Sequence, residues 1–336
     1  MGQSRGSADR PASTGWTGRL LLAVILVVPV AGATSHLLPL YLRCRHERKV
    51  ARELEALGWR VGISVKKLPD WIERGLGRRY CDLYARIDAA ECKGIGTEPE
   101  LRLLSGLREL TTLRLSETQA DDAGLEHLKG LPLKYLSLAG TRITDRGLEH
   151  LKTLTALEEL DLGGTRIGGD GLEHLKGLAH LRRLNLSRTR ITDDGLEHLK
   201  GLVNLNRLDL SRTRIAGTGV HHLGALTRLN ELLLDGTQLT DEGLGPESVK
   251  ALDVYRLSLA DTQVGDGTVQ HLMRLRAVDE LDLSRTQLTD TGLLTMTKMR
   301  CMLRRLFIGG TKVTEKGWDE FQRLRPWTLL PRKRGW

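Results

Sequence analysis

One stretch decides the fold: Thr141-Arg-Ile-Thr-Asp-Arg-Gly-Leu-Glu-His-Leu-Lys152. With small changes it returns at residues 165–176, 189–200 and 213–223. A fixed period of this length indicates a repeat architecture, in which each unit is completed by its neighbours. The threonine that opens the stretch recurs nine times at steps of 23 to 25 residues, as Thr118, Thr141, Thr165, Thr189, Thr213, Thr237, Thr262, Thr286 and Thr311.

Each unit predicts a strand, a turn and a short helix. The pattern Leu-x-x-Leu-x-Leu, with one Val or Ile in each of the last three units, precedes every threonine, for example at Leu157, Leu160 and Leu162. Its final alternation is typical of a short strand with one buried face. The Leu-x-x-Leu after the threonine, as in Leu148 and Leu151, has helical spacing. No unit can bury these leucines alone, so the stacked units must share one continuous core.

An aspartate column lies between the threonine and the helical leucines. A short polar side chain there can cap free N–H groups at a helix start. The column comprises Asp122, Asp145, Asp193, Asp241, Asp266 and Asp290.

These units resemble leucine-rich repeats, in particular the bacterial class with the repeat L-x-x-L-x-L-x-x-T-x-I-T-D-x-G-L-x-x-L, over about residues 80–321. The resemblance implies an α/β leucine-rich-repeat solenoid (a horseshoe) with a parallel concave sheet, short convex helices and binding rather than catalysis. Threonine stands where many members carry asparagine, whose side chain bonds loop backbone along the stack. Threonine hydroxyls can do the same more weakly.

An apolar segment, Leu20–Leu42, follows a small and polar stretch at 1–19 that we expect to be disordered. Its length suits a membrane-spanning helix, which takes about 20 residues. Ala31-Gly-Ala33 also fits a signal cleavage site, so export after cleavage near Ala33 is the alternative. The side of the membrane that the repeats occupy stays open, because basic residues flank the segment at both ends.

The rest of the chain divides into four parts. We expect a juxtamembrane helix at 43–58, an N-terminal cap at 59–109, nine repeats at 110–316, and a C-terminal cap with a basic tail at 317–336. Four aromatic residues could cover the exposed core of the last repeat: Trp318, Phe321, Trp327 and Trp336.

The residues that flank the inward strand leucines form columns on the predicted concave face. Their charges are mixed and aromatic residues are few, which suits polar recognition, with Tyr135 and Phe307 as aromatic anchors. The same positions would be ordinary solvated strand residues in a module of any function. The candidate binding residues are Tyr135, Glu159, Asp161, Arg183, Asn185, Arg207, Asp209, Glu231, Arg256, Glu280, Arg305 and Phe307.

A strip of arginines follows four successive anchor threonines: Arg142, Arg166, Arg190 and Arg214. Stacking about 5 Å apart would make these like charges repel, so the strip could bind a polyanion. Alternatively, the aspartate column beside it neutralises the strip.

The sequence gives little support for a metal site, an enzyme or nucleic-acid binding. Its histidine ladder has no carboxylate or thiolate at matching spacing, so we expect no metal site and no cofactor. No G-x-S-x-G, P-loop or C-x-x-C pattern occurs, which argues against an enzyme, and no nucleic-acid-binding motif accompanies the net charge of +9. Cys81 and Cys92 could pair if the domain is exported. The ladder comprises His127, His150, His174, His198, His222 and His271.

These observations predict a membrane-tethered module that binds an unknown protein. The alternatives are a binder of a polyanion or of the cell envelope surface that uses the arginine strip, and an enzyme in which the repeats supply specificity.

Overall fold

The computed structural model describes residues 43, 45–65, 85–250 and 252–328. The chain forms two compact units, residues 1–49 with 64–86 and residues 50–63 with 87–336, and the second contains every repeat. The predicted membrane segment Leu20–Leu42, the stretch before it, Cys81 and Trp336 lie outside the described residues. Within the described ranges, no helix combines the length and the apolar character that a membrane crossing requires.

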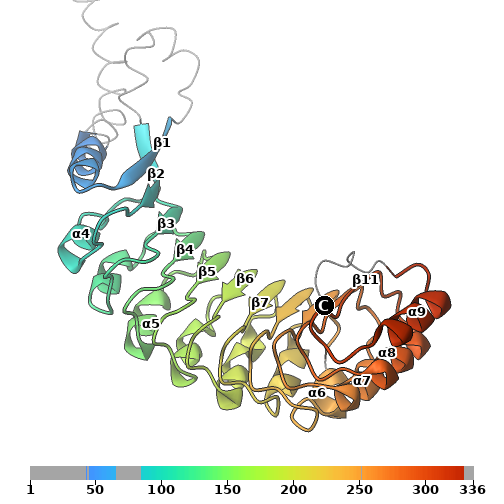
Figure 1. The fold of residues 1–336 in the computed structure, drawn as a ribbon. Coiled ribbons are helices and arrows are strands. Elements are labelled where there is room, and N and C mark those ends of the chain that lie inside the picture. Colours follow the sequence, from blue (N-terminus) through green and yellow to red (C-terminus); the bar gives the residue numbers. More distant parts are fainter. Residues whose placement is uncertain (1–42, 44, 66–84, 251, 329–336) are drawn as a thin grey trace, which may run out of the picture. The chain divides into compact units, whose positions relative to one another are not determined.

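In the described part of the chain, eleven strands form one sheet in the order in which they occur in the sequence (Figure 1). The paired strands from β2 to β11 run parallel, as the repeat pattern predicts. The strands are β1 (Arg60–Val65), β2 (Ala85–Glu91), β3 (Thr112–Arg114), β4 (Tyr135–Ser137), β5 (Glu159–Asp161), β6 (Arg183–Asn185), β7 (Arg207–Asp209), β8 (Glu231–Leu233), β9 (Arg256–Ser258), β10 (Glu280–Asp282) and β11 (Arg305–Phe307).

A helical segment lies across the core from the strands in each repeat (Figure 1). Four repeats use 3-10 rather than α geometry, which suits a segment of only one or two turns. The segments are α4 (Glu98–Arg102), η2 (Gly124–Leu128), α5 (Asp145–Leu151), η3 (Asp170–Leu175), η4 (Asp193–Gly201), η5 (Val220–Ala225), α6 (Pro246–Lys250), α7 (Asp266–Leu272), α8 (Asp290–Thr295), η6 (Met296–Lys298) and α9 (Glu315–Leu324). We call the two sides of the stack the sheet face and the helix face.

One continuous apolar core joins the repeats, because the strand and helix leucines of neighbouring units meet between the two faces. Leu136, Leu160 and Leu184 at the strand centres are at most 2% exposed, and so are the helix leucines Leu148 and Leu172. The core continues to Phe321 of α9. Stacking therefore buries what no single repeat could bury.

The threonine column stabilises turns within single repeats. All nine hydroxyls donate to the carbonyl three residues earlier in their own repeat, over 2.5 to 2.8 Å, as Thr165 does to Leu162. The expectation that they bond backbone along the stack, in the manner of asparagine, is therefore wrong. The hydroxyl is too short to leave its own turn.

The aspartate column makes the contacts between repeats. Asp145 accepts from the amide of Gly168 over 2.8 Å, and Asp193 accepts from Ala216, Gly217 and Gly219, all in the following repeat. These carboxylates therefore satisfy amides at the turn or helix start of the following repeat rather than of their own. Asp122, Asp241, Asp266 and Asp290 do the same.

The residue before each anchor threonine adopts a left-handed conformation. Four of the nine are glycines and the other five carry side chains, a conformation that costs an L-residue about 1–2 kcal/mol. The glycines are Gly140, Gly164, Gly236 and Gly310, and the others are Glu117, Arg188, Arg212, Asp261 and Arg285, with φ between 54° and 61°.

The two ends of the core are covered by different groups. Near the N-terminal end, Trp59 is 3% exposed, and its indole N–H donates to Glu100 Oε2 over 2.8 Å. At the C-terminal end Trp318 and Phe321 of α9 are buried as expected, whereas Trp327 is 65% exposed and does not cover the core.

Candidate functional site

The predicted binding column lies in register across the sheet face. Successive strands place Tyr135 beside Glu159, Glu159 beside Arg183, and so on along the sheet. We call this the sheet-face row: Tyr135, Glu159, Arg183, Arg207, Glu231, Arg256, Glu280 and Arg305.

Ion pairs join most of the row into two groups. Arg183 contacts Glu159 over 3.1 Å. The larger group begins with Arg207 and Glu231 at 2.7 Å and continues through Arg256 to Glu280. Arg305 closes it with a contact of 2.6 Å to Glu280. The break falls where register places two like charges, Arg183 and Arg207, side by side.

Carboxylates lie deep in the row and guanidinium groups lie outside. The side chains of Glu231 and Glu280 are 18% and 7% exposed, against 43% to 50% for Arg207, Arg256 and Arg305. Each arginine is held by an acid beneath it and still faces solvent. Glu231 Oε1 accepts no hydrogen bond from the described residues, although Arg256 Nη1 lies 3.1 Å away.

The second predicted column has a mainly structural role. Asp161, Asn185 and Asp209 each accept from the amide two residues later, over 2.9 to 3.0 Å, which closes a local turn after the strand. The Oδ1 atom of each of these side chains is therefore engaged within the protein. Phe307, at the end of this column, is half-buried.

Two aromatic residues accompany the sheet-face row, one at its first position and one beside Arg256. The guanidinium of Arg114 lies 5.1 Å from the ring centre of Tyr135. Tyr255, which is not among the predicted binding residues, is 45% exposed next to Arg256. A hydrogen bond to Asp279 raises the pKa of Tyr255, and Asp279 also contacts Arg304 over 3.2 Å. Tyr255 comes before the two strand residues that flank the buried leucine, so it belongs to neither of the two predicted columns.

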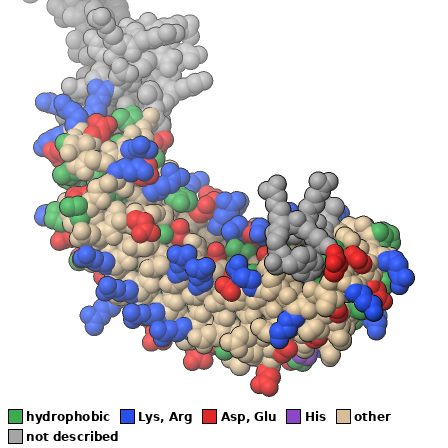
Figure 2. Space-filling view, viewed as in Figure 1, with side chains coloured by type: hydrophobic (Ala, Val, Ile, Leu, Met, Phe, Trp, Pro, Cys, Tyr) green, Lys and Arg blue, Asp and Glu red, His purple; other side chains and the backbone are tan. Residues whose placement is uncertain are grey.

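The arginine strip is exposed along one edge of the repeats. Within the described part of the chain, Arg142, Arg166, Arg190 and Arg214 make no side-chain ion pair or hydrogen bond. The aspartates expected to neutralise them accept backbone amides of the next repeat instead. Figure 2 shows basic and acidic side chains interspersed on the face in view.

The histidines and thiols are dispersed. In the described ranges no three His, Cys, Asp or Glu side chains come together in a way that could hold a metal ion. His127 instead contacts Glu98 over 3.1 Å, and burial lowers the pKa of His222. Cys92 is a buried free thiol whose pKa burial raises to about 11.

The repeats match a known family. Residues 131–191 and 179–239 match the family model described as leucine rich repeat. The chain therefore contains leucine-rich repeats. No curated protein matches it by sequence.

Two solved structures resemble this chain to different degrees. An internalin (inlF) from Listeria monocytogenes is 20% identical with a TM-score of 0.54, and the match covers 70% of this chain and 71% of the internalin. Internalin C2 from the same organism is 24% identical with a TM-score of 0.43, over 62% of this chain and 82% of that one. At this identity the first likeness is one of fold alone, and it agrees with the parallel sheet and short helices described above.

Proposed function

We propose that this leucine-rich repeat protein is a membrane-tethered module that binds a protein partner on its sheet face and has no catalytic activity of its own. The observation that carries the proposal is the sheet-face row, in which arginines on four strands are held by acids and remain exposed.

Pre-positioned arginines suit recognition because binding then orders fewer side chains. Arginine and tyrosine are also the residues most often found at the centres of interfaces. Arg207, Arg256 and Arg305, together with Tyr255, offer both types within five neighbouring strands. The partner surface should present carboxylates and carbonyl groups that fit between these guanidinium groups.

The tether would be Leu20–Leu42, with export after cleavage near Ala33 as the alternative. Its length and apolar character support an anchor. Protease treatment of intact spheroplasts, with an epitope after residue 336, tests the side: loss of the epitope places the repeats outside, and survival until lysis places them inside.

The binding proposal is tested with a photo-crosslinking amino acid at Tyr255 and, as the matched control, at Glu197 on the helix face. We expect a discrete crosslinked product from position 255 that disappears with R207E and R256E, while circular dichroism stays unchanged. Equal products from both positions, or a product that survives both charge reversals, would contradict binding at the sheet face.

A second candidate function uses the arginine strip. Its four exposed arginines lack acidic partners in the described ranges, and Arg188 and Arg212 lie close by in sequence, which favours a polyanionic ligand of the cell envelope. Heparin binding should weaken steeply between 50 and 200 mM salt, as expected for roughly four to six charge contacts. Binding that does not depend on salt would exclude this role.

A further inference from the structure

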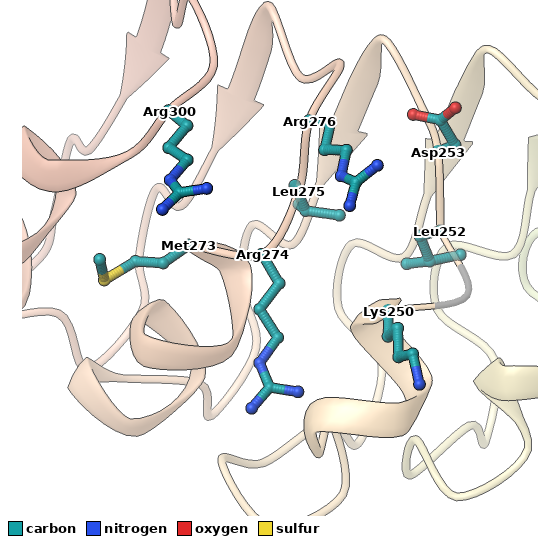
Figure 3. A pocket seen from close by; sticks show the side chains of 8 residues that line it. All are labelled: Lys250, Leu252, Asp253, Met273, Arg274, Leu275, Arg276 and Arg300. Atoms are coloured by element: carbon teal, nitrogen blue, oxygen red, sulfur yellow. The ribbon is translucent and has the colours of Figure 1, made fainter.

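A groove of about 650 Å³ opens where three repeats turn from their helices back to their strands (Figure 3). Residues of three consecutive repeats line it, so the stack itself forms the site. They are Lys250, Leu252 and Asp253 from the first repeat, Met273, Arg274, Leu275 and Arg276 from the second, and Arg300 from the third.

The groove occurs where the repeat is irregular. Helix α6 begins nine residues after Thr237, whereas α5, α7 and α8 each begin four residues after their threonine. Gly243-Leu-Gly-Pro246 explains the delay, because Pro246 fits the first position of a helix and would interrupt an earlier one. The delay moves α6 towards the returning turn, directly beside the groove.

The lining of the groove is strongly basic. Arg274, Arg276 and Arg300 are exposed, and within the described residues their side chains make no ion pair or hydrogen bond. Lys250 contacts Glu247 over 3.7 Å, with both side chains more than two-thirds exposed, so this pair contributes little. Asp253 is the acid among the lining residues, which leaves an excess of positive charge.

An apolar floor lies beneath these charges. Leu252 and Leu275 are 5% and 2% exposed, and the side chain of Met273 is half-buried. Low-polarity walls strengthen the field of nearby charges. The volume is within the range of sites that hold small molecules.

We propose that this groove binds a ligand that carries phosphate. Three guanidinium groups and one ammonium group can surround a phosphate ester from several sides, and arginine offers paired donors that match its oxygens. The groove precedes the strands of its repeats, whereas the arginine strip follows them, so the two basic regions lie at opposite edges of the sheet. A phosphorylated small molecule and a lipid headgroup share this chemistry.

The first experiment is titration calorimetry of the full chain in a non-ionic detergent with sodium pyrophosphate as the probe. We expect saturable binding that weakens at least tenfold in the R274Q/R276Q double variant, a loss that corresponds to about 1.4 kcal/mol. The R108Q/R146Q double variant removes the same charge from exposed positions outside both the groove and the arginine strip, and it should bind as the unchanged chain does. R300Q provides a third, independent substitution in the groove.

Mixed micelles that contain dihexanoyl phosphatidic acid or dihexanoyl phosphatidylcholine distinguish the source of the phosphate. Tighter binding to phosphatidic acid than to pyrophosphate assigns a lipid headgroup, and the reverse order assigns a soluble phosphate. Failure of both pyrophosphate and phosphatidic acid to bind saturably would overturn the proposal, as would equal losses in the groove variant and the R108Q/R146Q control. Circular dichroism confirms that each variant is folded.

Discussion

The carboxylate of Asp241 lies 2.9 Å from the amide nitrogen of Thr268, and this hydrogen bond joins one repeat to the first turn of the next repeat's helix. Gly265, Gly267 and the Thr268 hydroxyl donate to the same carboxylate. In some repeats the glycine of D-x-G is part of this contact, because a Cβ at Gly147 or Gly292 would overlap the carboxylate of Asp122 or Asp266 in the preceding repeat. Aspartate and glycine of adjacent repeats thus form one unit of the stack.

Asp241→Asn should lower the free energy of unfolding by about 1–3 kcal/mol at pH 7, because an amide cannot accept all four bonds. Burial opposes ionisation of Asp241, but these hydrogen bonds outweigh it and lower the pKa of its carboxyl group. Its stabilising effect is therefore present above the unfolded pKa of about 3.9 and is lost as the pH falls through the lower folded value.

The difference between Asp241→Asn and the unchanged chain should consequently shrink below about pH 4. Urea unfolding at several pH values measures it. Asp194→Asn is the control, because Asp194 is exposed and makes no such contact among the described residues. A difference that stays constant with pH would mean that the ionised carboxylate is not the stabilising form.

Arg188→Gly should raise the free energy of unfolding by about 0.5–1 kcal/mol. Arg188 has φ 58°, which glycine adopts without strain, and the relief exceeds the entropy that glycine loses on folding. The gain appears as a higher urea midpoint. Arg190→Gly removes the same charge two residues later, where φ is not positive, and should destabilise the chain. Equal losses in both variants would rule out strain at Arg188.

The fold could be predicted from the sequence because its information is periodic. The threonine at 24-residue steps fixes the strand register, and that register placed Arg207 beside Glu231 correctly. A period alone cannot say whether Asp145 bonds its own repeat or the next one, since both lie at the same place in the pattern. That distinction depends on the separation of neighbouring units in space.

The other omissions have different physical causes. The left-handed backbone conformation at Arg188 and Arg212 could not be predicted, because neither position has the glycine that usually indicates it. The groove forms because α6 begins five residues later than α5, α7 and α8 do in their repeats and because exposed turn residues line it. Neither feature belongs to the repeated sequence pattern, so the pattern could not predict the groove. Tyr255 lies outside the predicted columns, because it precedes the strand residues that flank the buried leucine.

Arg325→Gln should destabilise the C-terminal end of the stack. The Arg325 guanidinium donates to the carbonyls of Thr297, Met299 and Cys301, so it satisfies groups in and just after η6. Losing a charged donor from these carbonyls should cost about 2 kcal/mol. Hydrogen exchange should accelerate first in α8 and β11. The exposed Arg323→Gln is the control and should leave both elements unchanged, and an equal effect of the two substitutions would contradict a capping role.

Glu280→Gln should lower the free energy of unfolding by about 2 kcal/mol, because it leaves two arginines without the acid between them. Glu280 is 7% exposed and contacts Arg256 over 3.2 Å and Arg305 over 2.6 Å. Guanidinium chloride is a salt and would screen these ion pairs, so unfolding by urea at low salt is the appropriate measurement. Glu247→Gln, at a highly exposed carboxylate, is the control and should change stability by less than about 0.5 kcal/mol.

A double-mutant cycle with Arg256→Gln separates the ion pair from other consequences of losing Glu280. If the pair stabilises the row, the double variant loses less stability than the sum of the two single variants. Glu280 should also be coupled to Arg305, which has no other acidic partner among the described residues once Glu280 is replaced. Additive losses would mean that Glu280 supports the sheet through packing alone. The arginines of the row would then be positioned by the strands rather than by their counter-charges.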